Sequence, residues 1–155
     1  MGIPRPPIQL LESGNTIQAR GIANPKQHFT QLLKQFGRAS AKELHDISGF
    51  ILKARSPSCG LGSTPIHRKG KRERKGNGLF AETLTKALPL LPTIEESLIK
   101  NRELRNHFME QVYAYHGWQL FLQTDITKDT LNTFHQKHRL QLMAHSREHL
   151  RALER

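Results

Sequence analysis

The sequence predicts an α/β fold, and three observations lead to this prediction. Apolar residues at positions 29, 32, 33 and 36 have the i, i+3, i+4, i+7 spacing of the buried face of a helix. Ser48 and Gly49 can end that helix, and the short apolar run at residues 50–54 then predicts a buried strand. The segment after it, residues 55–60, predicts a loop beyond the carboxyl end of a strand, where α/β folds keep their sites.

The other elements of the first half follow from local signals. Residues 8–11 and 16–19 are short and partly β-branched, with turn residues between them, so they predict a β-hairpin. Asn24 and Pro25 predict the N-cap and the first residue of the helix that follows. Gly37 costs a helix about 1 kcal/mol relative to alanine, which leaves room for a break there.

The second half reads as mostly helical. Residues 61–78 predict a flexible basic loop, and residues 79–88 predict a helix that ends at Pro89. The string Thr93-Ile94-Glu95-Glu96 predicts a capping box. A helix through residues 98–118 should follow, then a polar linker at 123–128 and a last helix from about Asp129 to the end.

Composition limits the classes of protein. The 155 residues correspond to one domain, or to one domain and part of another. The single cysteine excludes an intramolecular disulfide, no apolar run approaches a membrane span, and the N-terminal residues lack the apolar core of a signal peptide. We therefore expect a reduced, cytoplasmic protein that does not enter a membrane.

The net charge of +11 favours polyanionic partners. Six basic residues concentrate in the predicted loop and could contact nucleic-acid phosphates: Arg68, Lys69, Lys71, Arg72, Arg74 and Lys75. No aromatic residue is interleaved for base stacking, and the glycines do not form a phosphate-binding motif. A solvated loop explains the same residues.

Cys59 is the sharpest chemical feature, because a thiolate is both a metal ligand and a nucleophile. Lys53, Arg55 and Arg68 are near in sequence and could stabilise a thiolate. A small, half-buried thiol in a turn explains the same residue, and a lone cysteine is a weak signal. A cysteine nucleophile with His67 as its base is a further alternative.

Other clusters have structural explanations. Four histidines lie along one side of the last predicted helix, but the first and last are about 21 Å apart, too far for one ion; they are His135, His138, His145 and His149. The pair Glu95 and Glu96 could act in acid–base chemistry, although a capping box explains Glu96. Five aromatic residues between 108 and 121 are typical of a core or an interface.

Several strings, in order, resemble one known family. They are MGIPRPPIQL at 1–10, GFILKARSPSCG at 49–60, GLFAETL at 78–84, PLLPTIEESLI at 89–99 and LRNHFMEQVYAYHGW at 104–118. Together they resemble the C-terminal half of the domain of unknown function 523, whose members are similar to thiouracil desulfidases. The string FHQKHRLQLMAHSREH at 134–149 resembles the start of the domain of unknown function 1722, found in YbgA-type proteins.

The resemblance implies a partial Rossmann-like domain at residues 1–122 and a helical stub at 129–155. In the family a 4Fe–4S cluster is held by three cysteines, and its open iron takes sulfur from a small thiolated substrate, as a soft Lewis acid would. Cys59 matches the last cysteine ligand. Ser56 and Ser58 match the serines of that motif, where one would bond to the substrate or to the cluster sulfur.

The family's other two cysteines lie upstream of the part that residues 1–7 match, so we expect a chain that lacks the N-terminal part of its domain. The function that follows is a fragment of a cluster-dependent desulfidase that holds no cluster and turns over no substrate alone. The alternative functions are a basic nucleic-acid-binding module and a protein-interaction module.

Overall fold

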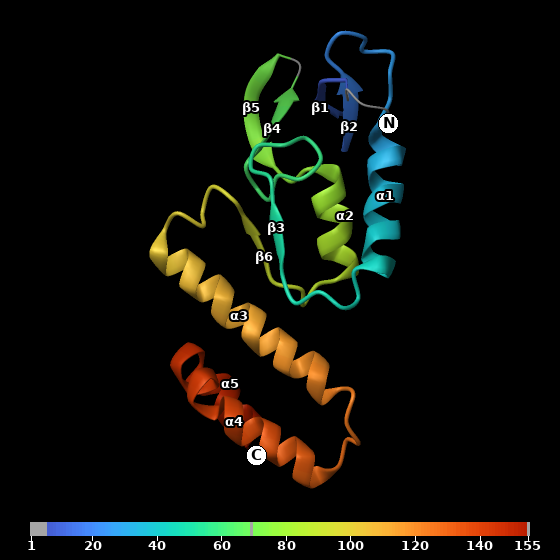
Figure 1. Ribbon diagram of the computed structural model, residues 1–155. Coiled ribbons are helices and arrows are strands. Elements are labelled where there is room, and N and C mark those ends of the chain that lie inside the picture. Colours follow the sequence, from blue (N-terminus) through green and yellow to red (C-terminus); the bar gives the residue numbers. More distant parts are fainter. Residues whose placement is uncertain (1–5, 69, 155) are drawn as a thin grey trace. The chain divides into compact units, whose positions relative to one another are not determined.

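The computed structural model describes residues 6–68 and 70–154 (Figure 1). The chain divides into two compact units, one up to Val112 and one from Tyr113. The first unit contains strands and helices in alternation, so the predicted α/β class is confirmed.

A four-stranded mixed sheet forms one half of the first unit. Strands β1 (Ile8–Ser13) and β2 (Thr16–Gly21) form the predicted hairpin, and β4 (Thr64–Arg68) lies parallel to β1. Strand β5 (Lys71–Gly76) pairs with β4 and gives the order β2-β1-β4-β5. The prediction of a flexible loop at 61–78 was therefore wrong. A charged edge strand carries little apolar signal, because its charges serve to keep the edge from pairing with other chains.

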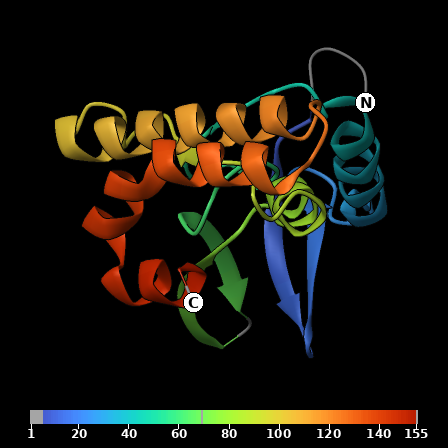
Figure 2. The same ribbon diagram turned by 90° about the horizontal axis from the view of Figure 1, so that it is seen from below.

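Two helices cover the sheet. Helix α1 (Thr30–Glu43) and helix α2 (Leu79–Ala87) lie side by side in both views (Figures 1 and 2). A Cβ on Gly37 would lie 2.9 Å from the Cβ of Thr83, so glycine permits this close approach and α1 continues unbroken through it. The break that the sequence allowed at Gly37 is absent for this reason.

The start of α1 also differs from the prediction. The N-cap is Phe29 rather than Asn24, and Pro25 lies outside the helix. The side chain of Asn24 instead accepts a hydrogen bond from the backbone nitrogen of Lys26, which is the bonding of an Asx turn. Asparagine and proline favour turns as well as helix starts, and in this chain the turn is adopted.

A second, two-stranded parallel sheet carries the candidate site. Strand β3 (Phe50–Leu52) pairs with β6 (Thr93–Glu95), with Leu52 opposite Glu95. The predicted capping box at residues 93–96 was wrong, because Thr93 and Ile94 enter this strand and helix α3 (Arg102–Phe121) begins only at Arg102. Glu95 and Glu96 therefore lie at the carboxyl end of a strand, beside the end of β3.

The core of the first unit has two clusters. One joins the sheet to α1 and α2 through Leu10, Ala19, Leu33, Ile66 and Leu79. The other packs β3 against α2 through Leu52, Phe80, Ala81 and Leu84, with Cys59 and Leu61 at its border. The loop after β3 is thus attached directly to the second cluster.

The second unit contains the end of α3 and the helices α4 (Lys128–His145) and α5 (Arg147–Leu153). Stacked and tilted rings of Trp118, Phe121 and Phe134 join α3 to α4, as expected for Trp118 and Phe121, whereas Tyr113 of the same predicted aromatic group is exposed. The single last helix of the prediction is interrupted at Ser146, whose hydroxyl caps α5 by accepting a bond from the nitrogen of His149. Among the described residues, no helix has the length and apolar character needed to cross a membrane.

Candidate functional site

The loop that follows β3 is seated on the N-terminal end of α2. Backbone nitrogens of Leu79 and Ala81 donate to the carbonyl oxygens of Pro57 (3.1 Å) and Ser58 (3.0 Å). These donors have no partner within a helix, so the loop satisfies them. A Cβ on Gly78 would lie 2.3 Å from the Ser58 oxygen, which requires glycine at this contact.

Ser56 organises the turn that presents Ser58 and Cys59. Its hydroxyl accepts hydrogen bonds from the backbone nitrogens of Ser58 (3.3 Å) and Cys59 (3.2 Å). Its carbonyl oxygen accepts from the nitrogen of Gly60 (2.9 Å) and from the hydroxyl of Thr64 (2.8 Å). Ser56 therefore fixes the backbone on both sides of the cysteine.

The three predicted site residues lie together. The hydroxyl of Ser58 is 3.1 Å from that of Ser56 and 3.3 Å from the sulfur of Cys59. All three side chains are half-buried, so they are neither sealed in the core nor fully solvated. Two hydroxyls beside one thiol can donate hydrogen bonds to a sulfur or oxygen atom brought to the same spot.

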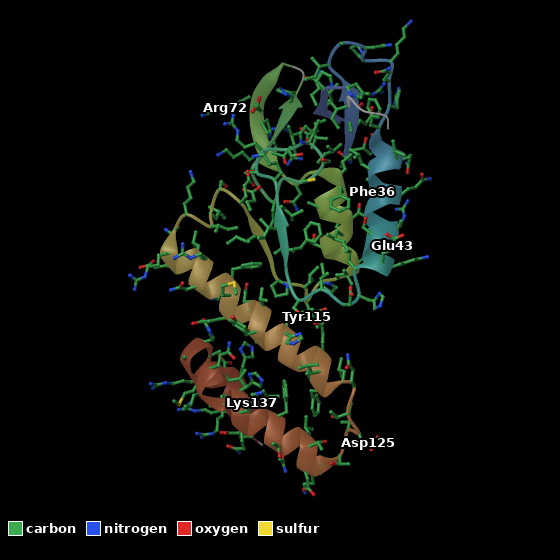
Figure 3. The ribbon with its side chains drawn as sticks, in the orientation of Figure 1. Phe36, Glu43, Arg72, Tyr115, Asp125 and Lys137 are labelled. Atoms are coloured by element: carbon green, nitrogen blue, oxygen red, sulfur yellow. The ribbon has the colours of Figure 1, made fainter. Side chains whose placement is uncertain are left out.

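An apolar groove of about 420 Å³ opens beside these residues. Its lining joins the start of β1, helix α1, the site loop and α2: Pro6, Ile8, Leu32, Leu33, Phe36, Ser56, Pro57, Ser58, Cys59 and Phe80. Phe36 projects from α1 toward α2 (Figure 3), and its ring centroid lies 5.3 Å from that of Phe80. Aromatic and aliphatic walls with a few polar groups at one end are typical of a small-molecule site.

Two adjacent glutamates hold the two ends of the loop. Buried Glu95 accepts a hydrogen bond from the nitrogen of Leu61 (2.6 Å) and another from the hydroxyl of Ser63. Glu96 accepts from Lys53 Nζ and from the nitrogen of Ala54, both at 2.5 Å, and these bonds hold the pKa of Glu96 below its usual value. The sequence had assigned Glu96 to a helix cap. The signal missed was Pro92-Thr93-Ile94, which is also compatible with a short strand.

The structure separates the other candidate residues from Cys59. His67 pairs with Glu73 at 3.1 Å and lines a different hollow with Arg68 and Glu12, so it is not a base for the thiol. Arg68 bonds to Glu12, and Lys53 bonds to Glu96. Arg55 lies at the start of the loop with φ of 60°, in the left-handed region that favours glycine.

The six basic residues are not one free surface. Glu12 bonds to both Arg68 and Arg74; burial alone would raise the pKa of Glu12, but these guanidiniums outweigh it and lower that pKa. Arg72 and Lys75 are exposed, and Arg72 extends outward from β5 (Figure 3). Lys69 lies outside the described residues, and the backbone of Lys71 opens β5.

The histidines of α4 have local partners. His135 lies 3.7 Å from the Glu154 carboxylate, which also accepts a hydrogen bond from Arg139 at 2.7 Å. His138 contacts Gln141 at 3.3 Å and packs on the ring of Phe134. His135 thus connects α4 to the end of α5, whereas the contacts of His138 lie within α4.

The comparisons with known proteins give one result. Residues 1–96, more than half of the chain, match the family model described as 2-thiouracil desulfurase. The chain belongs to the 2-thiouracil desulfurase family. No curated protein and no solved structure matches it. The matched stretch of this desulfurase-family chain includes the groove, the site loop and both glutamates, and it ends at Glu96.

Proposed function

We propose that the first unit is the substrate-binding part of a desulfurase that acts on a small thiolated heterocycle of the thiouracil kind. The observation that carries the proposal is the groove, where apolar walls end at Ser56, Ser58 and Cys59. A planar ring fits between such walls, while its thiocarbonyl sulfur meets the hydroxyls and the thiol at one end. The family to which the chain belongs supports this substrate class.

The chain's own groups have defined tasks in this proposal. The side chains of Leu32, Phe36 and Phe80 supply the apolar surface on which the ring packs. The hydroxyl of Ser58 lies beside the Cys59 sulfur and donates a hydrogen bond to the substrate sulfur. Ser56 keeps the backbone turn in place, because its hydroxyl accepts hydrogen bonds from the backbone nitrogens of Ser58 and Cys59.

An iron–sulfur cluster does not fit the donors of this chain alone. Soft thiolate ligands suit such clusters, and the sequence offers one cysteine, beside hydroxyl oxygens that are harder ligands. Cys59 could supply one ligand to a 4Fe–4S cluster, but one thiolate does not hold a cubane. We therefore assign no reaction step to a cluster, and we propose that this chain alone binds substrate without turning it over.

Calorimetric titration with 2-thiouracil, with uracil as the matched ligand, tests the proposal. We expect 2-thiouracil to bind and uracil to bind more weakly, because only the first presents sulfur to the thiol end of the groove. Phe36→Ala should weaken both ligands, whereas Ser58→Ala should weaken 2-thiouracil selectively. Equal binding of both ligands, or binding that Phe36→Ala leaves unchanged, would contradict the proposal.

Reconstitution tests the statement on turnover. The purified chain is incubated with iron and sulfide without oxygen, and its visible absorption and sulfide release from 2-thiouracil are recorded. We expect neither the broad absorption of a cluster nor sulfide release. If both are seen, and Cys59→Ala abolishes them, the chain holds a cluster and the proposal of an inactive chain is wrong.

Three wider proposals accompany this one. We propose that β3, α2 and β6, with their parallel strand pairing, belong to a partial Rossmann-like domain that extends over residues 1–122. We propose that residues 129–155 form the start of a YbgA-type domain, on the resemblance of residues 134–149. We also propose a cytoplasmic location, which the single free thiol supports.

A second candidate function is phosphate binding by the β4–β5 hairpin, as in a nucleic-acid-binding module. The exposed side chains of Arg72 and Lys75 favour it, while the bonding of Arg68 and Arg74 to Glu12 reduces the charge available. Binding to single-stranded RNA should then fall steeply with salt, and Arg72→Ala with Lys75→Ala should flatten that dependence. Binding without salt dependence would exclude this candidate.

A further inference from the structure

The site loop carries a backbone conformation that needs support. Arg55, the residue directly before Ser56, has φ of 60° although it is not glycine. Such residues persist only where surrounding groups hold them, and they concentrate at functional sites. The group that holds Arg55 therefore controls where Ser56, Ser58 and Cys59 lie.

A hydrogen-bonded relay reaches Arg55 from strand β6. The backbone nitrogen of Arg55 donates to the hydroxyl of Ser63 at 2.7 Å, and that hydroxyl donates to the carboxylate of Glu95. Glu95 is only 5% exposed, and its carboxylate accepts hydrogen bonds from the far end of the same loop, from Leu61 and Ser63. The carboxylate thus orients the Ser63 hydroxyl so that its lone pair faces Arg55.

The neighbouring Glu96 holds the residue on the other side of Arg55. Its carboxylate accepts a hydrogen bond of 2.5 Å from the backbone nitrogen of Ala54, directly before Arg55. The two carboxylates therefore fix the loop at its entrance and its exit, while Ser56 accepts the bonds within it. Hydrogen bonds to a carboxylate are among the stronger ones in proteins, which suits this task.

We propose that Glu95, acting through Ser63, is a positioning residue that keeps Arg55 in its left-handed conformation and so fixes the Ser56–Cys59 turn at the groove. The importance of this positioning for desulfuration rests on the proposed function, but the positioning itself does not. Without the relay, Arg55 relaxes to negative φ and rotates the peptide that leads into Ser56. The hydroxyl of Ser56 then leaves the nitrogens of Ser58 and Cys59, and the half-buried thiol becomes more accessible.

The rate at which iodoacetamide alkylates Cys59 measures this opening and needs neither substrate nor cluster. Ser63→Ala removes the relay, and Ser97→Ala is the matched control at an exposed serine. We expect Ser63→Ala to raise the rate about tenfold, the effect of one lost strong hydrogen bond on the opening equilibrium, and Ser97→Ala to leave it unchanged. Urea unfolding of each variant separates local opening from global instability.

Two further variants separate positioning from a merely structural role. Glu95→Gln keeps an acceptor oxygen and should alkylate near the wild-type rate, whereas Glu95→Leu should resemble Ser63→Ala. In the Ser63→Ala background, Arg55→Gly removes the penalty for positive φ and should return the rate toward that of the wild type. If Glu95→Leu does not fold, the Ser63 and Arg55 variants decide alone.

The proposal is overturned if folded Ser63→Ala alkylates no faster than Ser97→Ala. It is equally overturned if the Arg55→Gly, Ser63→Ala double variant reacts as fast as Ser63→Ala alone. A wild-type chain that fails to bind 2-thiouracil would contradict the proposed function and leave these rates unaffected, so the two failures are distinguishable.

Discussion

Replacing Gly78 by alanine should dislodge the site loop from α2. The added Cβ would lie 2.3 Å from the Ser58 oxygen and 2.4 Å from its carbonyl carbon, and both are backbone atoms. Relief of the overlap requires a displacement of about 1 Å, since carbon atoms pack at about 3.5–4.0 Å. Such a displacement breaks the bonds from Leu79 to Pro57 and from Ala81 to Ser58.

The magnitude follows from those two losses. Each backbone hydrogen bond contributes about 1 kcal/mol net, and residual overlap adds about 1–2 kcal/mol, so the free energy of unfolding should fall by about 3–4 kcal/mol. Gly14→Ala is the matched control, because it meets no atom within 4 Å and only its φ of 58° opposes the change. That control should cost about 1 kcal/mol.

Urea unfolding gives both free energies, and hydrogen exchange of the Cys59 and Gly60 amides reports the loop itself. Gly78→Ala should speed exchange at these amides, and Gly14→Ala should not. If Gly78→Ala costs no more than Gly14→Ala and leaves the exchange unchanged, then the loop is not held on α2 as described.

Three further predictions concern single charges and a cap. Hydrogen bonds from Lys53 and Ala54 lower the pKa of Glu96 in the folded chain. The stability that the ionised Glu96 carboxylate contributes is therefore complete above the ordinary glutamate pKa of about 4.3, and it is lost as the pH falls through the lower pKa of the folded state. Glu96→Gln should therefore unfold with a weaker pH dependence than the wild type below about pH 4, and an identical dependence would refute the assignment. Glu12→Gln should release Arg68 and Arg74 and increase retention on a heparin column at low salt, whereas Glu43→Gln, an exposed control on α1, should change retention less. Thr127→Ala removes the capping box at the start of α4 and should lower stability by about 1 kcal/mol in thermal unfolding, with no loss if the cap contributes nothing.

The sequence was sufficient for elements with strong periodicity. The hairpin at β1 and β2, the helix α1 with its apolar face, and the strand at Phe50 with a loop after it were all predicted from local pattern. The apolar residues of these elements repeat with the period of a helix or a strand, although partners such as α2 for α1 and β6 for β3 are distant in the chain. Their pattern therefore carries the information, and the position of Cys59 beyond a strand followed from it.

Elements whose signal lies in distant partners were missed. Strand β5 has a charged sequence, and its pairing depends on β4 and on the ion pairs of Glu12. Strand β6 is short, and Glu95 at its end and Glu96 after it bond to a segment more than thirty positions earlier in the chain. No local pattern shows that Glu95 and Ser63 meet, because that contact exists only after β3 and β6 have paired.

Protection of Cys59 from alkylation by 2-thiouracil tests the central claim most directly. The alkylation rate of the wild-type chain is measured with increasing 2-thiouracil, and with uracil at the same concentrations. If the groove beside Ser56, Ser58 and Cys59 holds a thiolated ring, 2-thiouracil slows alkylation in a saturable way, uracil does so less, and Phe36→Ala loses the protection. If alkylation proceeds equally fast with and without 2-thiouracil, the groove is not the binding site and the proposed function is contradicted.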